Sequence, residues 1–150
     1  GTSSSCLDQQ GDENLVHVLL CLDDRNGMLF HNRRQSRDRT VIQNIRRTAE
    51  KSRLWIAPIS LVLFQGDEKF LSVDPFPLKR AKAGEFCFIV DSPLLPYVDK
   101  LESVTVYRWN RVYPADFHLD FPVEKQWRLA FAEDFPGYSH EKITKEVYLP

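Results

Sequence analysis

Long hydrophobic runs and an excess of charge of one sign are both absent from this chain of 150 residues. No apolar stretch approaches the roughly 18 to 20 residues that cross a bilayer, so we expect no membrane partner. The first residues, 1 to 5, lack the basic and apolar regions of a signal peptide, which indicates a cytoplasmic protein. A net charge of -1 argues against a generally polyanion-binding surface, so any nucleic-acid site would have to be local.

Cysteine and histidine are scarce and show no ligand spacing. The three cysteines, Cys6, Cys21 and Cys87, are odd in number and widely spaced, and two of them lie in apolar runs. We therefore expect reduced thiols, two of them in the core. The four histidines are paired neither with one another nor with a cysteine at the spacing of a zinc site, so no metal is predicted.

Methionine is rare as well, since Met28 is the only one and the chain opens on Gly1. Residues 1–12 are therefore interpreted as a tag remnant or flexible N-terminal segment. The content of 43% hydrophobic and 27% charged residues is ordinary for a globular protein. We predict a single α/β domain over residues 13–150.

Apolar runs and turn signals alternate in the first half. The almost wholly apolar segment 14–23 predicts a central strand buried on both faces, and Asp24–Gly27 is a turn signal. Ser36 is expected to cap a helix that runs to about Lys51, with one apolar stripe. Residues 54–56 predict a buried strand or a continuation of the helix. A new helix is expected from Pro58 to Gln65, and a weaker strand at 70–73.

The second half is the most informative part of the chain. It predicts a helical turn or two from Pro77, a strand at 86–90, a short helix capped by Ser92, and a strand at 104–109. Two final segments alternate between apolar and polar residues and are joined by a Pro-Gly turn, which is typical of an antiparallel hairpin. These segments are 127–135 and 140–148.

This order of elements resembles that of dihydrofolate reductase. The opening Leu20–Gly27 and the following helix look like the first strand, turn and helix of that family. The resemblance implies a mixed, mainly parallel sheet with flanking helices and a C-terminal antiparallel hairpin. It also makes Asp38 the candidate for the catalytic acid of the pterin pocket.

The cofactor motifs of the family are largely replaced. Where the resemblance implies a Gly-Gly pair, this chain has Asp91-Ser92, which adds bulk and negative charge toward a polyanionic cofactor. Where it implies a basic residue, the chain has Pro58, and only the hydroxyl of Ser60 is kept. We therefore predict a degenerate dinucleotide site and no cofactor, with NADPH as the open alternative.

An arginine-rich loop precedes the first helix. Forked guanidinium groups beside helix N-terminal amides predict a site for an anionic or nucleotide-like ligand. The alternative is a solvated turn whose arginines pair with acids or with a second subunit, and Asp38 between two arginines would then stay ionised. The arginines concerned are Arg33, Arg34, Arg37 and Arg39.

A second cluster interleaves aromatic and basic residues after the strand at 104–109. Arg108 and Arg111 could bind a phosphate while Trp109 or Tyr113 stacks on a planar ring. The alternative is a strand whose aromatic residues pack and whose arginine pairs with Asp116. Further along, residues 139–141 read Ser-His-Glu, but neighbours on a strand alternate between faces and cannot form a nucleophilic triad by themselves.

Three functional hypotheses follow. The first is a dihydrofolate reductase-like domain that binds a small anionic or nucleotide-like ligand, or acts as an accessory protein. The second is a nicotinamide-dependent reductase of a pterin-like heterocycle, with Asp38 near the reacting ring and Ser60 near the cofactor. The third is an RNA-linked protein or ribonuclease that uses the two arginine-rich loops. A homo-oligomer is an open alternative for the partner.

Overall fold

A seven-stranded mixed sheet forms the centre of the computed structural model, which describes residues 15–30, 33–34, 38–64 and 69–150. The sheet order is β5-β4-β6-β1-β7-β10-β9. Strands β5 to β7 in this order run parallel, whereas β10 is antiparallel to both of its neighbours. The strands are β1 (Val16–Leu22), β4 (Leu54–Ile56), β5 (Leu71–Val73), β6 (Phe86–Phe88), β7 (Leu101–Arg108), β9 (Arg128–Phe135) and β10 (Ile143–Leu149).

This arrangement confirms the predicted fold class. The apolar run at 14–23 is the central strand β1, because it lies between β6 and β7 and is covered on both faces. The predicted C-terminal hairpin is the antiparallel pair β9–β10, in which Ile143 lies opposite Phe135 and Leu149 opposite Arg128.

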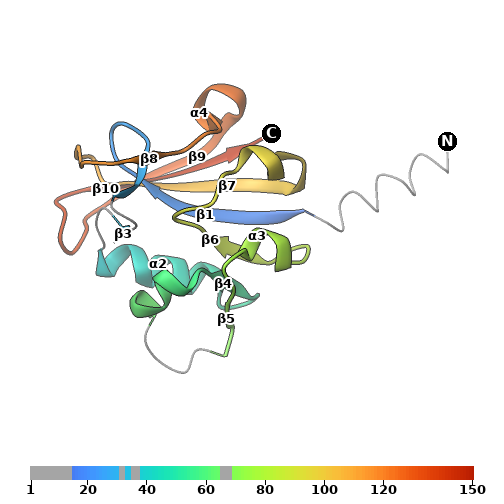
Figure 1. Ribbon diagram of the computed structural model, residues 1–150. Coiled ribbons are helices and arrows are strands. Elements are labelled where there is room, and N and C mark those ends of the chain that lie inside the picture. Colours follow the sequence, from blue (N-terminus) through green and yellow to red (C-terminus); the bar gives the residue numbers. More distant parts are fainter. Residues whose placement is uncertain (1–14, 31–32, 35–37, 65–68) are drawn as a thin grey trace.

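Helices cover both faces of the sheet (Figure 1). One face packs against α2 (Arg39–Ala49) and the 3-10 helix η1 (Pro58–Phe64), whose apolar residues form a cluster with Leu19, Phe88 and Tyr107. The opposite face packs against residues of three short helices, in a cluster that includes Val18 and Val106. These helices are α3 (Pro77–Arg80), η2 (Leu95–Lys100) and α4 (Val123–Gln126).

A small second sheet lies beside the carboxyl end of β1. It has the order β3-β2-β8 and consists of β2 (Gly27–Phe30), β3 (Arg33–Arg34) and β8 (Phe117–His118). The predicted turn between β1 and β2 is present. Asp23 accepts the backbone N–H groups of Arg25 and Gly27, and Asn26 takes a left-handed conformation with φ 62°.

Several predicted boundaries are wrong. Strand β7 begins at Leu101 and not at residue 104, and β6 ends at Phe88 and not at residue 90. The first helix begins at Arg39 with Asp38 as its N-cap, because the Asp38 carboxylate accepts the N–H of Thr40; Ser36 lies outside the described residues. The helix expected from Ser92 is η2, which begins only at Leu95, and the backbone N–H of Leu94 donates to Asp120. Residues 140–142 precede β10 as a loop and do not belong to the strand.

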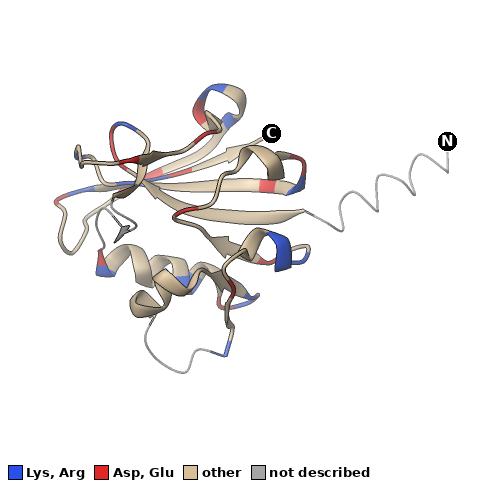
Figure 2. Ribbon diagram, viewed as in Figure 1, with Lys and Arg blue, Asp and Glu red and all other residues tan. Residues whose placement is uncertain are grey.

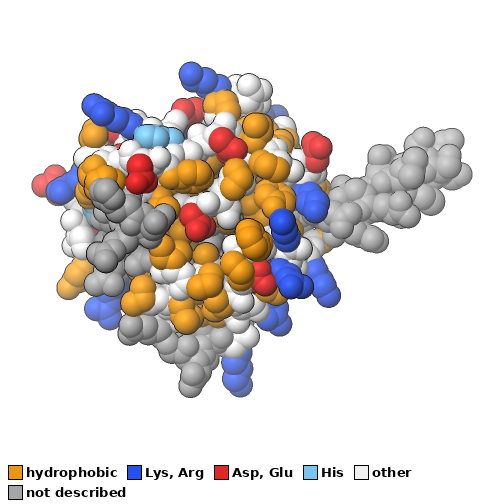
Figure 3. Space-filling view, viewed as in Figure 1, with side chains coloured by type: hydrophobic (Ala, Val, Ile, Leu, Met, Phe, Trp, Pro, Cys, Tyr) orange, Lys and Arg blue, Asp and Glu red, His pale blue; other side chains and the backbone are white. Residues whose placement is uncertain are grey.

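The edge strand β9 is exposed along nearly its whole length. Leu129 and Phe131 are each 50% exposed, so their alternation does not cover a core face here. Their register to β10 shifts between Val147 and Tyr148, which marks a β-bulge. Figure 3 shows that hydrophobic side chains also gather on the face seen in Figure 1, with acidic residues among them.

Two further sequence predictions concern thiols and membranes. Cys21 is half-buried and Cys87 is buried, and no disulfide joins the two; burial raises the pKa of the Cys87 thiol to about 12. Cys6 lies outside the described residues. Among the residues that the structure describes, no helix is long and apolar enough to cross a membrane.

Candidate functional site

The N-terminus of α2 meets the loop between β9 and β10 at the carboxylate of Asp38. Oδ1 accepts the backbone N–H groups of Thr40 at 2.9 Å and Tyr138 at 2.8 Å. Oδ2 accepts the backbone N–H of Ser139 at 2.7 Å and lies 3.0 Å from His140 Nδ1. Four donors match the roughly four acceptor positions of an ionised carboxylate. Asp38 thus joins segments that are about 100 residues apart in sequence.

Asp38 is ionised in this setting. Burial by itself would raise the pKa of its carboxyl group, since the side chain is 0% exposed. The hydrogen bonds from Tyr138, His140, Ser139 and Thr40 outweigh burial and lower the pKa below its ordinary value. The prediction that Asp38 stays ionised is confirmed in direction, but its partners are backbone amides and an imidazole. The direct catalytic role predicted for Asp38 stays a prediction, and every acceptor position of the carboxylate is occupied.

His140 connects Asp38 to Tyr113. Its Nε2 lies 2.8 Å from the hydroxyl oxygen of Tyr113, on the side of the ring opposite Asp38. The Trp109 ring stacks on the imidazole with centroids 4.6 Å apart and an interplanar angle of 23°. Asp38 and His140 are both buried, whereas Tyr113 is half-buried. The result is a chain of hydrogen bonds, Asp38–His140–Tyr113, assembled from three separate loops.

The hydrogen-bond chain Asp38–His140–Tyr113 lies at the carboxyl ends of β1 and β7. The N–H of Trp109 donates to the carbonyl of Leu22, and the N–H of Tyr113 donates to Asp23 Oδ2 at 2.9 Å. In open α/β sheets, ligands bind in the crevice outside the carboxyl ends of the strands. The position of this chain is therefore the one at which a functional site is expected in such a sheet.

The two predicted stacking residues are both part of this arrangement. Trp109 is 2% exposed and its ring faces His140, so it presents no open face to a ring from outside. Tyr113 packs at the margin of the core and uses its hydroxyl for His140.

The predicted ion pair between Arg108 and Asp116 is wrong. Its guanidinium group is 2.6 Å from Glu124 Oε2 and 2.6 Å from Glu146 Oε1, whereas Asp116 was expected. Burial would lower the pKa of Arg108, but the hydrogen bond and the charge of Glu146 raise it. Arg108 therefore ties β7 to β10 and α4. Arg111 is exposed, and its carbonyl accepts the N–H of Asp24.

The arginine-rich loop is described only in part. Arg33 and Arg34 form the backbone of β3, but their side chains lie outside the described residues, as does Arg37. Arg39 is exposed and borders a cavity between α2, η1 and the β9–β10 loop. Figure 2 shows the acidic start of α2 and the basic residues that follow on it.

This cavity has a volume of about 530 Å³. Its cationic groups are Arg39 and Arg46, which are seven residues apart and therefore lie on one face of α2. Ile42, Val62 and Leu63 provide apolar wall, and the β9–β10 loop closes one side with Tyr138 and Ser139. Sequence reasoning missed Arg46, although its spacing from Arg39 was a usable signal. It also missed Tyr138 and the role of His140, for which no local signal exists.

Ser60 and Asp91-Ser92 were predicted to mark the cofactor side. Ser60 is fully buried in η1, and its Oγ has no hydrogen-bond partner among the residues that the structure describes. Asp91 and Ser92 follow β6 and border a smaller cavity of about 250 Å³, together with Lys79, Phe76 and Tyr97. Within the described ranges, no group of three or more His, Cys, Asp or Glu side chains could hold a metal ion.

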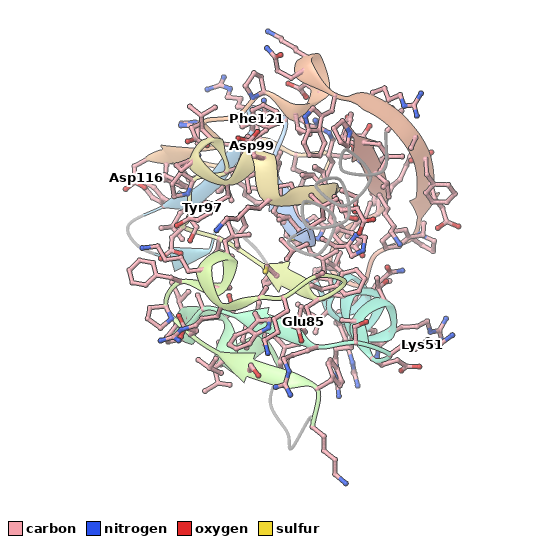
Figure 4. All side chains as sticks on the ribbon, turned by 90° about the vertical axis from the view of Figure 1, so that its right-hand side faces the viewer. Lys51, Glu85, Tyr97, Asp99, Asp116 and Phe121 are labelled. Atoms are coloured by element: carbon pink, nitrogen blue, oxygen red, sulfur yellow. The ribbon has the colours of Figure 1, made fainter. Side chains whose placement is uncertain are left out.

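A second acid–histidine–hydroxyl chain lies at the opposite edge of the sheet. His17 Nδ1 is 2.7 Å from Ser103 Oγ, and its Nε2 is 3.0 Å from Glu102 Oε2. The His17 side chain is 26% exposed and that of Glu102 is 48% exposed. These residues lie near the amino ends of β1 and β7, the edge that Figure 4 views and on which Glu85 is labelled.

The architecture has a counterpart among solved structures. A dihydrofolate reductase from Enterococcus faecalis, complexed with NADP(H) and RAB-propyl, superposes with a TM-score of 0.63, covering 91% of this chain and 96% of that one. The fold is that of dihydrofolate reductase. The sequence identity is 7%, so the dihydrofolate reductase-like fold is all that this likeness shows. No family model and no curated protein matches the sequence.

Proposed function

We propose that this dihydrofolate reductase-like domain binds a small anionic or nucleotide-like ligand in the cavity between α2, η1 and the β9–β10 loop. The observation that carries the proposal is the pairing of Arg39 and Arg46 on one wall of a cavity of about 530 Å³. Ligand pockets typically have about 300 to 1,000 Å³ and a few converging polar groups, and the lining of this cavity is more polar than apolar. Ile42, Val62 and Leu63 supply the apolar part of such a pocket.

The charge of α2 supports an anionic ligand. Its first turn contains no acidic side chain within the helix, and its last turn carries Arg46 and Arg47. The one acid at its start, Asp38, also borders the cavity, but it is buried and its oxygens already accept four hydrogen bonds, so none is left for a direct bond to Arg39. A guanidinium group binds carboxylate or phosphate oxygens in a forked geometry.

The same structure argues against a dinucleotide. The cavity beside Asp91 and Ser92 has about 250 Å³, below the usual range for a drug-sized ligand, and a dinucleotide is larger still. The exposed Asp91 carboxylate would lie near the cofactor phosphates and repel them. These residues do not fit NADPH, so we derive no hydride-transfer step for this protein.

Thermal shift measurements test the proposal with defined probes: inorganic phosphate, a nucleoside monophosphate, a dicarboxylate, NADPH and a short RNA. A ligand at about 100 times its dissociation constant adds about 2.7 kcal/mol of stability. We expect stabilisation by at least one of the small anions and its loss in Arg46→Ala. Arg128→Ala, which removes an exposed arginine on β9, is the matched control and should respond like wild type.

Three results would contradict the proposal. The first is a flat response to every small anion, and the second is a response that Arg46→Ala leaves unchanged. The third is a dissociation constant for NADPH at or below about 1 µM, which corresponds to about -8.2 kcal/mol. Stabilisation by RNA alone would favour the RNA-linked alternative instead.

A further inference from the structure

The hydroxyl of Tyr113 meets the conditions for an activated side chain. Such groups are recognised by a hydroxyl or thiol within about 2.6 to 3.2 Å of a base that is itself oriented by a third group. Here the hydroxyl of Tyr113, the imidazole of His140 and the carboxylate of Asp38 are linked at 2.8 Å and 3.0 Å. By contrast, Tyr107 donates to the amide oxygen of Asn44, and Tyr148 donates to the carboxylate of Glu146, which Arg108 neutralises.

The contact with Asp38 determines which ring nitrogen of His140 carries a proton. Asp38 is ionised and acts only as an acceptor, so His140 Nδ1 carries a proton and donates it to Oδ2. When the imidazole is neutral, its lone pair is on Nε2, which then accepts the proton of the Tyr113 hydroxyl. Trp109 stacks on one face of the ring and Asp38 holds its edge, so the imidazole has little freedom to rotate.

Burial strengthens the interactions between Asp38 and His140. The side chains of Asp38 and His140 are 0% and 2% exposed, so water does not compete for the carboxylate or the imidazole. An imidazolium formed at His140 would be stabilised by an adjacent buried carboxylate, and this stabilisation is stronger than it would be in water. Tyr113 is half-buried and is the outermost member of the chain.

We propose that Tyr113 is a base-activated phenol and forms a site of proton transfer to which no function has been assigned. In the step that the geometry supports, the Tyr113 oxygen accepts a proton from an O–H or N–H group of a bound small molecule. The Tyr113 hydroxyl proton passes at the same time to His140 Nε2, and the imidazolium is held by Asp38. The proton returns by the reverse path, so no other reactant is consumed. His140 and Asp38 are positioning residues in this scheme. The scheme does not depend on the anion cavity.

An aryl sulfonyl fluoride tests the reactivity of the phenol directly. The Tyr113 oxygen would form an S–O bond, fluoride would leave with the S–F electron pair, and the phenol proton would pass to His140. Tyr138 is the internal control, because it is 73% exposed. We expect Tyr113 to be labelled at least tenfold faster than Tyr138 in peptide mass spectra, since a general base contributes roughly 10²–10⁴-fold.

Replacement of the base separates activation from accessibility. His140→Gln keeps an acceptor for the Tyr113 hydroxyl but cannot take up its proton, so labelling of Tyr113 should fall at least tenfold while labelling of Tyr138 stays the same. Labelling of Tyr113 that is no faster than that of Tyr138, or that His140→Gln does not slow, would overturn the proposal.

The wild-type protein alone gives a second readout that does not require a folded variant. Nitrogen-15 NMR of the His140 ring should show a protonated Nδ1 and an unprotonated, hydrogen-bonded Nε2 near neutral pH. A proton found on Nε2 in the neutral ring would exclude Tyr113 as a donor to it and would refute the scheme.

Discussion

The two acid–histidine–hydroxyl chains of this protein have nearly the same distances but very different surroundings. Asp38–His140–Tyr113 lies at the carboxyl edge of the sheet with its acid and base buried. Glu102–His17–Ser103 lies at the amino edge, with the acid 48% exposed and the histidine 26% exposed. Exposed ion pairs contribute about 0 to 1 kcal/mol because water and salt screen them. Geometry alone therefore does not identify a functional chain; burial decides whether the same contacts fix protonation and orientation.

The largest difference is expected from removing each acid. Asp38→Ala leaves three backbone N–H groups and the imidazole without their acceptor, and it removes a helix cap. We expect a loss of about 3 to 5 kcal/mol in unfolding free energy, from several hydrogen bonds to a charged group. Glu102→Ala should change the unfolding free energy by about 0.5 kcal/mol or less. Urea unfolding of both variants checks the comparison, and equal losses would break it.

The next largest effect should come from the glycine that lets the β9–β10 loop approach Asp38. A Cβ at Gly137 would lie 2.8 Å from Asp38 Oδ2 and 2.9 Å from the carbonyl oxygen of His140. Gly137→Ala should therefore cost about 1 to 3 kcal/mol by overpacking and should shift the NMR signals of His140. Gly84→Ala is the contrast, since Gly84 has φ +81° and open space around its Cβ position. It should cost about 1 kcal/mol without moving the His140 signals.

The stability that ionised Asp38 contributes should be lost gradually at acidic pH. The folded protein holds the pKa of Asp38 below the ordinary value of 3.8, so ionised Asp38 stabilises the fold at pH values above that value. This stabilisation is lost as the pH falls through the lower, folded pKa. The difference in unfolding free energy between wild type and Asp38→Asn should therefore shrink below about pH 4. A constant difference from pH 6 to pH 2.5 would argue against an ionised Asp38.

The smallest effect is expected from the coupling within the exposed chain. A double-mutant cycle of His17→Ala and Glu102→Ala should give a coupling energy of about 0.5 kcal/mol or less, and this value should fall further in high salt. The corresponding cycle for His140→Ala and Asp38→Ala should give a larger coupling energy that salt changes little. Similar salt dependence in both cycles would contradict the distinction between the edges.

The sequence was sufficient for the fold because its signals are local. The buried run that became β1, the alternation in β9–β10 and the turn at Asp23–Gly27 each depend on neighbouring residues. For the site, the sequence indicated Asp38 but not the residues that contact it. Asp38 was selected, but its partners come from residues 138–140, about 100 positions away, and no spacing within one element reports such a contact.

The misplaced helix start has the same cause. Ser36 and Asp38 are both good N-caps, and local propensity does not choose between them. The choice of Asp38 is consistent with the tertiary contacts of its carboxylate with the β9–β10 loop. Likewise, His140 looked like part of a final strand because alternation continued through it. Strand β10 begins at Ile143, and residues 138–140 form a loop that contacts Asp38 at the start of α2.

The bulge in β9 has a consequence for how copies of this protein behave toward one another. An edge strand with exposed Leu129 and Phe131 would ordinarily be a template for strand pairing between molecules and for aggregation. The bulge breaks the flat register that such pairing requires, and the charged side chains of Arg128, Glu133 and Asp134 punctuate the same strand. The bulge and these charges therefore oppose strand pairing between molecules. A variant without the bulge should stay monodisperse only at lower protein concentrations.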